Sequence, residues 1–457
     1  MADIGVALLG LVLNEAREGF VMGTLATRGT SHKNNFCAVA EPFLHAEGLP
    51  FAEVLDAASI QRVFREENAL FGQNDIFSTD VVLWAFLAQA LRDGKGAACA
   101  AAVADIATCM LQTGQRPPSG DTGDYCRALA KLSVPALRRL VVESAGDLER
   151  EAEASWLWKG RHAKLVDGFT FTLPDTPENQ AAFPQLASQT PGVGFPIARC
   201  CTVVSLATAC VCDLAIGPYE GKETGENALL RGMLDTFDEN DVVVFDRHYC
   251  SYRMLAMLAS GGVEVCARLH QRRPGDFRRG RRLGKDDHLI TWTRPARPAW
   301  MSEEQYTQIP ETLTLREVRF HVSVPGRRTE TLTVVATLTD PEVYSVEDIA
   351  ELYGFRWNVE LDIRTIKQTL NLDHVRCKTP EMVRRELWVT LLAYNLIRKV
   401  IATAAATHGK SPRHLGFTLA CQTILSSWML LSTGVVGDVV GLQPDPQGDR
   451  DRRRHAR

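Results

Sequence analysis

Hydrophobic residues change their spacing along the chain, and the change separates a helical part from a part built of strands. From Ser78 to about residue 150, apolar residues recur every three or four positions, which predicts a run of helices. Ser78 and Ser133 are suited to cap two of these helices, and Pro135 suits the first turn of the second. The first ~65 residues have weak periodicity and are predicted to be irregular.

From Ala163 the apolar residues alternate with polar ones or form continuous runs, which predicts strands. Three predicted strands come first, AKLVDGFTFTL, ARCCTVVSLATAC and VCDLAIG. A helix (ALLRGMLDTF), a strand (DVVVFDRHY), a second helix (SYRMLAMLASG) and a fifth strand (VEVCARL) follow. This order is typical of a ribonuclease-H-like mixed sheet. A β-rich block then separates the fifth strand from the next predicted helix.

These patterns predict an α/β protein: a ribonuclease-H-like mixed sheet interrupted by a β-rich insertion, with a helical domain before it. The expected divisions are an irregular segment (1–68), a helical DNA-binding domain (69–158), the first part of the catalytic core (159–269), the insertion (270–340), the second part of the core (341–405), and a helical region with a basic tail (406–457).

Composition is that of a folded soluble protein, with 45% hydrophobic and 23% charged residues. Net charge is only −4, so overall charge does not indicate a polyanion partner, although residues 270–285 form a basic run. The 12 cysteines lack metal-finger spacing and suit a reducing cytosol. The uncharged stretch from Thr418 to Gly437 contains Gln, Ser and Gly, which favours a buried helix over a membrane span.

The segment YGFRWNVELDIRTIK carries the most distinctive polar pattern. Tyr353, Arg356, Glu360 and Lys367 fall at offsets 0, 3, 7 and 14, so on one continuous helix they would share a stripe about 60° wide. An aromatic hydroxyl, a carboxylate and two cationic groups on one face suit a phosphate ester beside a metal ion. The alternative is the solvated face of a charged helix.

Two further acids end apolar strands. Asp167 follows LV on the first predicted strand, and Asp246 follows VVVF on the fourth. These strands are neighbours in a ribonuclease-H-like sheet, so both carboxylates can converge with Glu360. Three converging carboxylates repel one another unless a cation neutralises them, and hard oxygen ligands favour Mg²⁺. Taken singly, Asp167 could be a turn residue and Asp246 a helix cap.

The motifs together resemble the DDE transposases of insertion sequence family four, which carry a Y-x2-R-x3-E-x6-K signature. YGFRWNVELDIRTIK matches that signature in residue type and spacing, VDGFTFTLPDTPENQ resembles the segment around the first aspartate, and VVFDRHYCSYRML resembles the segment around the second. The similarity covers about residues 75–425.

The resemblance implies that Asp167, Asp246 and Glu360 bind metal and that Tyr353, Arg356 and Lys367 hold the phosphates of a DNA end. It implies two Mg²⁺ ions, with Mn²⁺ as a substitute, and a sequence of 3′-end nicking, hairpin formation and strand transfer. The implied partners are double-stranded DNA, as terminal inverted repeats and target, and a second copy of the chain in a synaptic homodimer. No membrane is expected, and the implied location is the bacterial cytoplasm, at the nucleoid.

Other residues have weaker expected roles. Arg247 and Arg268 follow the second aspartate and end the fifth strand, where each could face a DNA phosphate or pair with a local carboxylate. Trp292, or alternatively Trp300, is a candidate to stack on a flipped base, although a buried Trp is the commoner case.

Two alternatives to a transposase stay open from the sequence. The first is another metal-dependent nuclease on the same fold, such as a resolvase, which needs the acids but not the full stripe. The second is an inactive remnant that binds DNA ends. The N-terminal ~65 residues and the ending DRDRRRHAR depart from the family pattern, which keeps the second alternative open.

Overall fold

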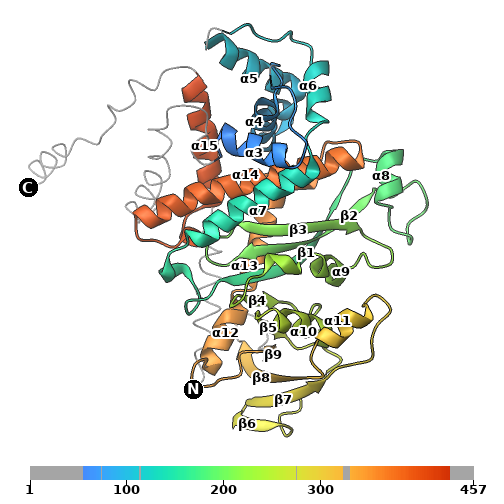
Figure 1. Ribbon diagram of the computed structural model, residues 1–457, viewed down its shortest axis with the longest axis vertical. Helices are drawn as coiled ribbons and strands as arrows, with labels where there is room; N and C mark the ends of the chain where they lie inside the picture. The colour runs from blue at the N-terminus through green and yellow to red at the C-terminus, as the bar shows by residue number, and fades with distance from the viewer. Residues whose placement is uncertain (1–54, 74, 113–114, 274, 323–329, 433–457) are drawn as a thin grey trace, which may run out of the picture.

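One sheet runs through the protein and organises both the predicted core and the β-rich block. The computed structural model describes residues 55–73, 75–112, 115–273, 275–322 and 330–432, and within them nine strands pair in the order β3-β2-β1-β4-β5-β9-β8-β7-β6 (Figure 1). The strands are β1 (Ala163–Thr172), β2 (Ile197–Ser205), β3 (Val211–Pro218), β4 (Val242–Phe245), β5 (Glu264–Arg268), β6 (Arg281–Gly284), β7 (Asp287–Thr293), β8 (Thr312–Val322) and β9 (Glu330–Ala336).

The first five strands have the mixed arrangement that the sequence predicted. β1 is antiparallel to β2 and parallel to β4, and β4 is parallel to β5. The first and fourth strands are therefore neighbours. β9 pairs antiparallel with β5, so the strands of the β-rich block extend the same sheet.

Helices cover both faces of this sheet. They are α3 (Ala57–Glu66), α4 (Thr79–Ala90), α5 (Cys99–Gln112), α6 (Gly123–Leu129), α7 (Val134–Arg150), α8 (Pro177–Ala182), α9 (Glu226–Arg231), α10 (Tyr252–Ser260), α11 (Glu303–Gln308), α12 (Val346–Gly354), α13 (Trp357–Thr369), α14 (Pro380–Thr407) and α15 (Phe417–Ser432). One hydrophobic cluster joins helices α4, α7, α13 and α14 to one face of the sheet. A second cluster places α9 and α10 on the opposite face.

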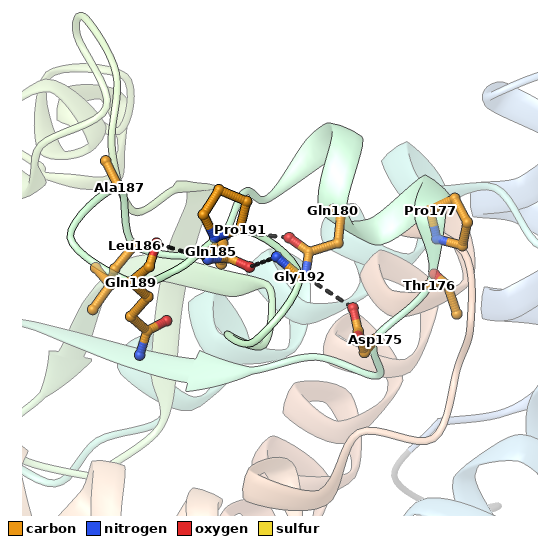
Figure 2. A pocket seen from close by; sticks show the side chains of 10 residues that line it. All are labelled: Asp175, Thr176, Pro177, Gln180, Gln185, Leu186, Ala187, Gln189, Pro191 and Gly192. Atoms are coloured by element: carbon orange, nitrogen blue, oxygen red, sulfur yellow. Dashed lines mark hydrogen bonds between the residues drawn. The ribbon is translucent and has the colours of Figure 1, made fainter.

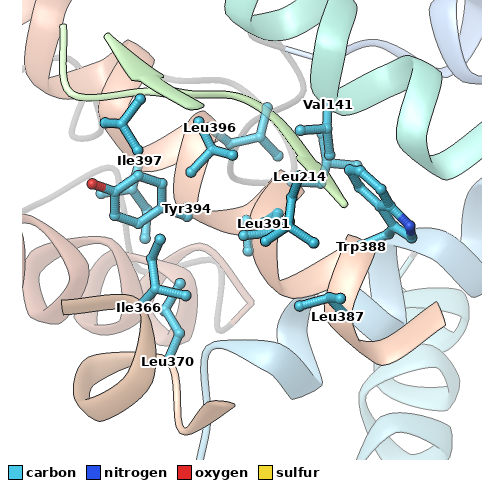
Figure 3. Packing of buried hydrophobic residues seen from close by; sticks show 14 of the residues in the cluster. Val141, Leu214, Ile366, Leu370, Leu387, Trp388, Leu391, Tyr394, Leu396 and Ile397 are labelled. Carbon is cyan, nitrogen blue, oxygen red and sulfur yellow. The ribbon is translucent and has the colours of Figure 1, made fainter. Parts of the chain in front are cut away.

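α14 is the central helix of the first cluster. Its residues Leu391 and Tyr394 pack with Val141 of α7, Leu214 of β3 and Ile366 of α13 (Figure 3). Among the described residues, α14 alone is long and apolar enough to cross a membrane, but 83% of its apolar window is buried inside the protein. Its hydrophobicity is therefore explained by its place in the core.

The predicted irregular N-terminal segment is wrong for residues 57–66, which form α3. Asp56 caps this helix by accepting a hydrogen bond from the Ser59 amide at 2.6 Å, and Ile60, Val63 and Phe64 are fully buried. The apolar spacing of these three residues is helical, but the stretch is too short to stand out from its surroundings. Residues 1–54 and the basic tail lie outside the described residues.

The prediction of one continuous helix through the YGFRWNVELDIRTIK segment is also wrong. α12 ends at Gly354 and α13 begins at Trp357. At the junction and in the first turn of α13, the amides of Arg356, Asn358 and Val359 bond to carbonyls three residues back rather than four. Gly354 has a low helix propensity, which weakens the helix at this point. The predicted helix ALLRGMLDTF is likewise interrupted, because α9 ends at Arg231.

Candidate active site

Asp167 and Asp246 occupy equivalent positions on two neighbouring parallel strands. The last paired residues of β1 and β4 are Val166 and Phe245, and the two aspartates follow them directly. β1 continues to Thr172 without a strand partner on its β4 side. Because β4 stops here, both carboxylates lie where the sheet opens.

Asp167 is mostly buried, with a side chain 20% exposed, and accepts a hydrogen bond from the Gly168 amide at 2.8 Å. Burial raises its pKa to about 6, and the nearby charges of Glu360 and Glu226 act in the same direction. The Gly168 amide and Arg356 act against the rise. Asp167 therefore carries a charge that its protein surroundings only partly compensate.

Arg356 lies between Asp167 and Glu360. Its guanidinium is 2.9 Å from a Glu360 oxygen and 3.7 Å from an Asp167 oxygen. The side chain is buried, and its Nε atom has no hydrogen-bond partner among the residues that the structure describes. Glu360 itself is 40% exposed and sits in the first turn of α13. A buried donor without a partner is rare in folded proteins and is one feature that marks this position as a functional candidate.

Tyr353 belongs to α12 but reaches the same region from the other side of the helix break. It is 4% exposed, and burial raises its pKa to about 12. Arg356, Arg268 and Asp246 all lie near enough to influence it electrostatically. Tyr353 and Arg356 therefore lie close together although Tyr353 belongs to α12 and Arg356 caps the start of α13.

Lys367 lies farther along α13, against β1. Its ammonium donates to the Thr170 carbonyl at 3.1 Å and pairs with Asp373 at 3.0 Å. This position is three residues beyond Asp167 on the same strand. Lys367 therefore fastens α13, the helix of Glu360, to the strand that carries Asp167.

Three other predicted residues, Arg247, Trp292 and Trp300, make contacts that do not involve Asp167, Arg356 or Glu360. Arg247 follows Asp246, and its guanidinium is 3.5 Å from the side-chain oxygen of Gln271. Trp292 is only 5% exposed, and Arg273 stacks on its ring at 3.8 Å. Trp300 is partly buried beneath Arg231, also at 3.8 Å. The structure does not present the Trp292 ring for stacking with a base.

Glu226 and Trp357 are neighbours of the site that the sequence patterns did not single out. Trp357 is 44% exposed and its ring lies 4.3 Å from the Arg356 guanidinium. Glu226 begins α9, and its carboxylate lies against Gly168. The signal that could have led to Glu226 is the glycine directly after the first aspartate.

The acids suit a divalent cation by their chemistry, since carboxylate oxygens are the ligands that Mg²⁺ and Mn²⁺ prefer. Within the described ranges, no three His, Cys, Asp or Glu side chains lie close enough together to hold a metal ion. Arg356 supplies positive charge between Asp167 and Glu360 instead. The donor set fits a cation, provided that the guanidinium gives up its contact with the acids.

A separate pocket lies beside the segment that connects β1 to β2. Gln180 and Gln185 close this loop through hydrogen bonds to Asp175, Gly192 and the Gly194 carbonyl (Figure 2). Its volume is about 550 Å³, and its lining contains no lysine or arginine. It includes none of the predicted site residues.

The similarity of this chain to known proteins includes the residues of the candidate site. A family model described as "Transposase DDE domain" matches residues 158–396. The transposase InsG of insertion sequence element IS4 from Escherichia coli K12 is 26% identical over 398 residues, which cover 86% of each chain. The putative transposase InsL of IS186A, from the same organism, is 35% identical over 68 residues, 15% of this chain and 18% of InsL.

A solved structure, the piggyBac transposase synaptic complex with hairpin DNA, aligns over 92% of this chain and 84% of that one. The two chains are 10% identical in sequence, and the TM-score is 0.40.

Proposed function

The chain belongs to the DDE transposase family, and we propose that it cuts and rejoins insertion-sequence ends with Asp167, Asp246 and Glu360 as its metal-binding acids. As a member of this family, the protein is a DNA transposase that depends on a divalent metal. The predicted resemblance to insertion sequence family four is confirmed by the similarity to InsG across most of both chains.

The arrangement around Arg356 is the observation that carries the site assignment. One buried guanidinium contacts the first and third predicted acids, and its Nε donor has no partner. Two bound Mg²⁺ ions would supply the charge that these acids need and would activate the attacking oxygen. Asp167, Asp246 and Glu360 would hold them.

Arg356, which contacts Asp167 and Glu360 in the structure, then has a second proposed role as a phosphate-binding residue. Once cation charge compensates Asp167 and Glu360, the guanidinium can turn to the phosphate that is being cut. A planar guanidinium matches two phosphate oxygens, and the Nε donor of Arg356 has no competing partner among the described residues. Tyr353, buried next to Arg356, orients it, while Lys367 holds α13 against β1.

The proposed reaction is a series of in-line displacements at phosphorus. Water releases a 3′-hydroxyl at the end of the element, this hydroxyl attacks the opposite strand to form a hairpin, water opens the hairpin, and the free 3′-hydroxyl attacks target DNA. One set of acids serves every step because each step has the same geometry. We place the protein in the bacterial cytoplasm on nucleoid DNA, with two copies holding the two ends.

The direct test uses linear DNA that carries the terminal inverted repeats of its own element, with the purified full chain and Mg²⁺. We expect hairpin-ended, flank-free product from the wild type. Glu360→Gln should abolish cleavage and leave end binding in a gel-shift assay unchanged. Cleavage by Glu360→Gln would refute the assignment of the acids, and binding without cleavage by the wild type, also in Mn²⁺, would indicate an inactive remnant.

A further inference from the structure

The carboxylate of Glu226 lies unusually close to the backbone of the strand that carries Asp167. A Cβ atom added at Gly168 would be 2.1 Å from Glu226 Cδ and 2.4 and 2.5 Å from its two oxygens. Gly168 has no positive φ that would itself demand glycine. A side chain at position 168 would therefore require the Glu226 carboxylate to move, because this carboxylate fills the space beside Gly168.

Two contacts hold Glu226 in this place. The buried Tyr249 hydroxyl donates to Glu226 Oε2 at 3.1 Å, and the next residue, Asn227, donates from its side chain to the His248 carbonyl at 2.9 Å. Both partners belong to the segment directly after Asp246. The first turn of α9 is thus tied to the second predicted acid as well as to the first.

Glu226 reaches the acids from the opposite face of the sheet. Successive residues of a strand point to opposite faces. Leu165 and Phe169 belong to the cluster with α13 and α14, so Asp167 lies on that face, whereas Val166 belongs to the cluster with α10. Gly168 and Glu226 therefore lie on the α10 face. The Glu226 carboxylate nevertheless approaches the backbone of the residue next to Asp167, just beyond the last residue pair of β1 and β4.

Glu226 lacks a charge partner of its own. In the part of the chain that the structure describes, no lysine, arginine or histidine forms an ion pair with it; Arg356 serves Asp167 and Glu360 on the other face. A carboxylate placed near a second, mostly buried carboxylate is unfavourable unless a cation compensates both.

We infer that Glu226 is a fourth acid of the catalytic centre and contributes a carboxylate oxygen to a divalent cation that it shares with Asp167. This rests on the proposed metal site and extends it to a residue outside the three-acid signature. Asp167 is then the link between two acid pairs, with Glu360 on the helix-covered face and with Glu226 on the opposite face.

The test measures cation binding, separately from cleavage. Mn²⁺ is titrated into the full-length protein, bound to an uncut DNA end, by calorimetry and by the electron paramagnetic resonance signal of free Mn²⁺. Because Glu226→Gln keeps the side-chain shape, thermal unfolding should change little. We expect Mn²⁺ affinity to fall about tenfold or more, as for the loss of a group that supports a metal.

Two variants complete the design. Glu223→Gln changes an exposed carboxylate that pairs with Arg231, and it should bind Mn²⁺ as the wild type does. Gly168→Ala forces the Glu226 carboxylate away and should weaken Mn²⁺ binding in the same way as Glu226→Gln.

The outcomes separate this inference from the proposed function. If Asp167→Asn loses Mn²⁺ and Glu226→Gln retains wild-type affinity, Glu226 is only a structural neighbour and the inference is overturned, while the three-acid site stands. If the wild type binds no Mn²⁺ at all, both are overturned.

Discussion

Asp362 holds α13, the helix of Glu360, against α14 and the segment after it. Replacing Asp362 tests how much this attachment contributes to stability. Asp362 lies two residues after Glu360, is 3% exposed, and accepts from Arg398 at 3.2 Å and from Arg413 at 3.0 Å. Replacement by Asn keeps the shape and removes the charge. Arg398, 5% exposed, can still donate to the Asn oxygen and to the Tyr394 hydroxyl, but it loses the opposite charge.

The expected loss of stability depends on how many interactions each of the two guanidinium groups keeps. Removing one partner of a buried ion pair typically costs about 3–5 kcal/mol, because the other charge stays buried. Arg413 keeps bonds to the Ser205 and Leu206 carbonyls, and a cleft of about 550 Å³ borders Asp362 and both arginines, so water can solvate them. These features place the destabilisation by Asp362→Asn at the lower end of this range, about 3 kcal/mol.

Thermal unfolding followed by circular dichroism measures the effect. At roughly 2 °C per kcal/mol for a large chain, Asp362→Asn should lower Tm by about 6 °C. Asp124→Asn is the control, because its pair with Arg127 is exposed on both sides and worth about 0–1 kcal/mol. Equal Tm values for the two variants would show that Asp362 does not fasten α13 in this way.

Three further predictions concern other contacts. Arg356→Ala should reduce hairpin yield well beyond any change in Tm, and Arg356→Lys should not restore it, since a lysine cannot form paired bonds; unchanged hairpin yield would exclude the phosphate role. The hydrogen bond that the His162 ring donates to the Glu149 carboxylate raises the pKa of His162 above its ordinary 6.5, so the stabilisation from this pair should be complete below that pH and lost as pH rises through the folded-state pKa. His162→Gln should therefore lower Tm more at pH 5.5 than at pH 8.5; an equal loss at both would contradict the pairing. Trp292→Ala should destabilise the fold by about 3–5 kcal/mol, whereas loss of hairpins at unchanged Tm would restore a base-stacking role.

The positions of Asp167 and Asp246 could be predicted because strand order alone makes them neighbours. Each follows a short run of apolar residues, and β1 and β4 pair in parallel with their ends in register. The apolar runs before the two aspartates can be read locally from the sequence. Only the strand order of the fold has to be assumed. The pairing of β9 with β5 depends on contacts between distant segments, which hydrophobic periodicity does not encode.

The helix break at residues 355–356 shows where the pattern was misread. The spacing of Tyr353, Arg356 and Glu360 fits one helix face, but Gly354 lies between them and lowers the local helix propensity. Arg356 and Glu360 nevertheless form an ion pair across the start of α13, so their proximity does not require one continuous helix. Glu226 was missed because its proximity to Gly168 arises from packing between α9 and β1.

The late position of α13 and α14 has a consequence for synthesis. Roughly 190 residues separate Asp167 from Glu360, so at ~5–20 residues per second a ribosome needs about 10–40 s to connect them. Throughout that interval, one face of the nascent sheet lacks α14, the helix that buries it. A chain interrupted before Pro380 would expose this apolar face and be prone to aggregate, so unfinished products should be removed by quality control rather than compete with the intact protein for DNA.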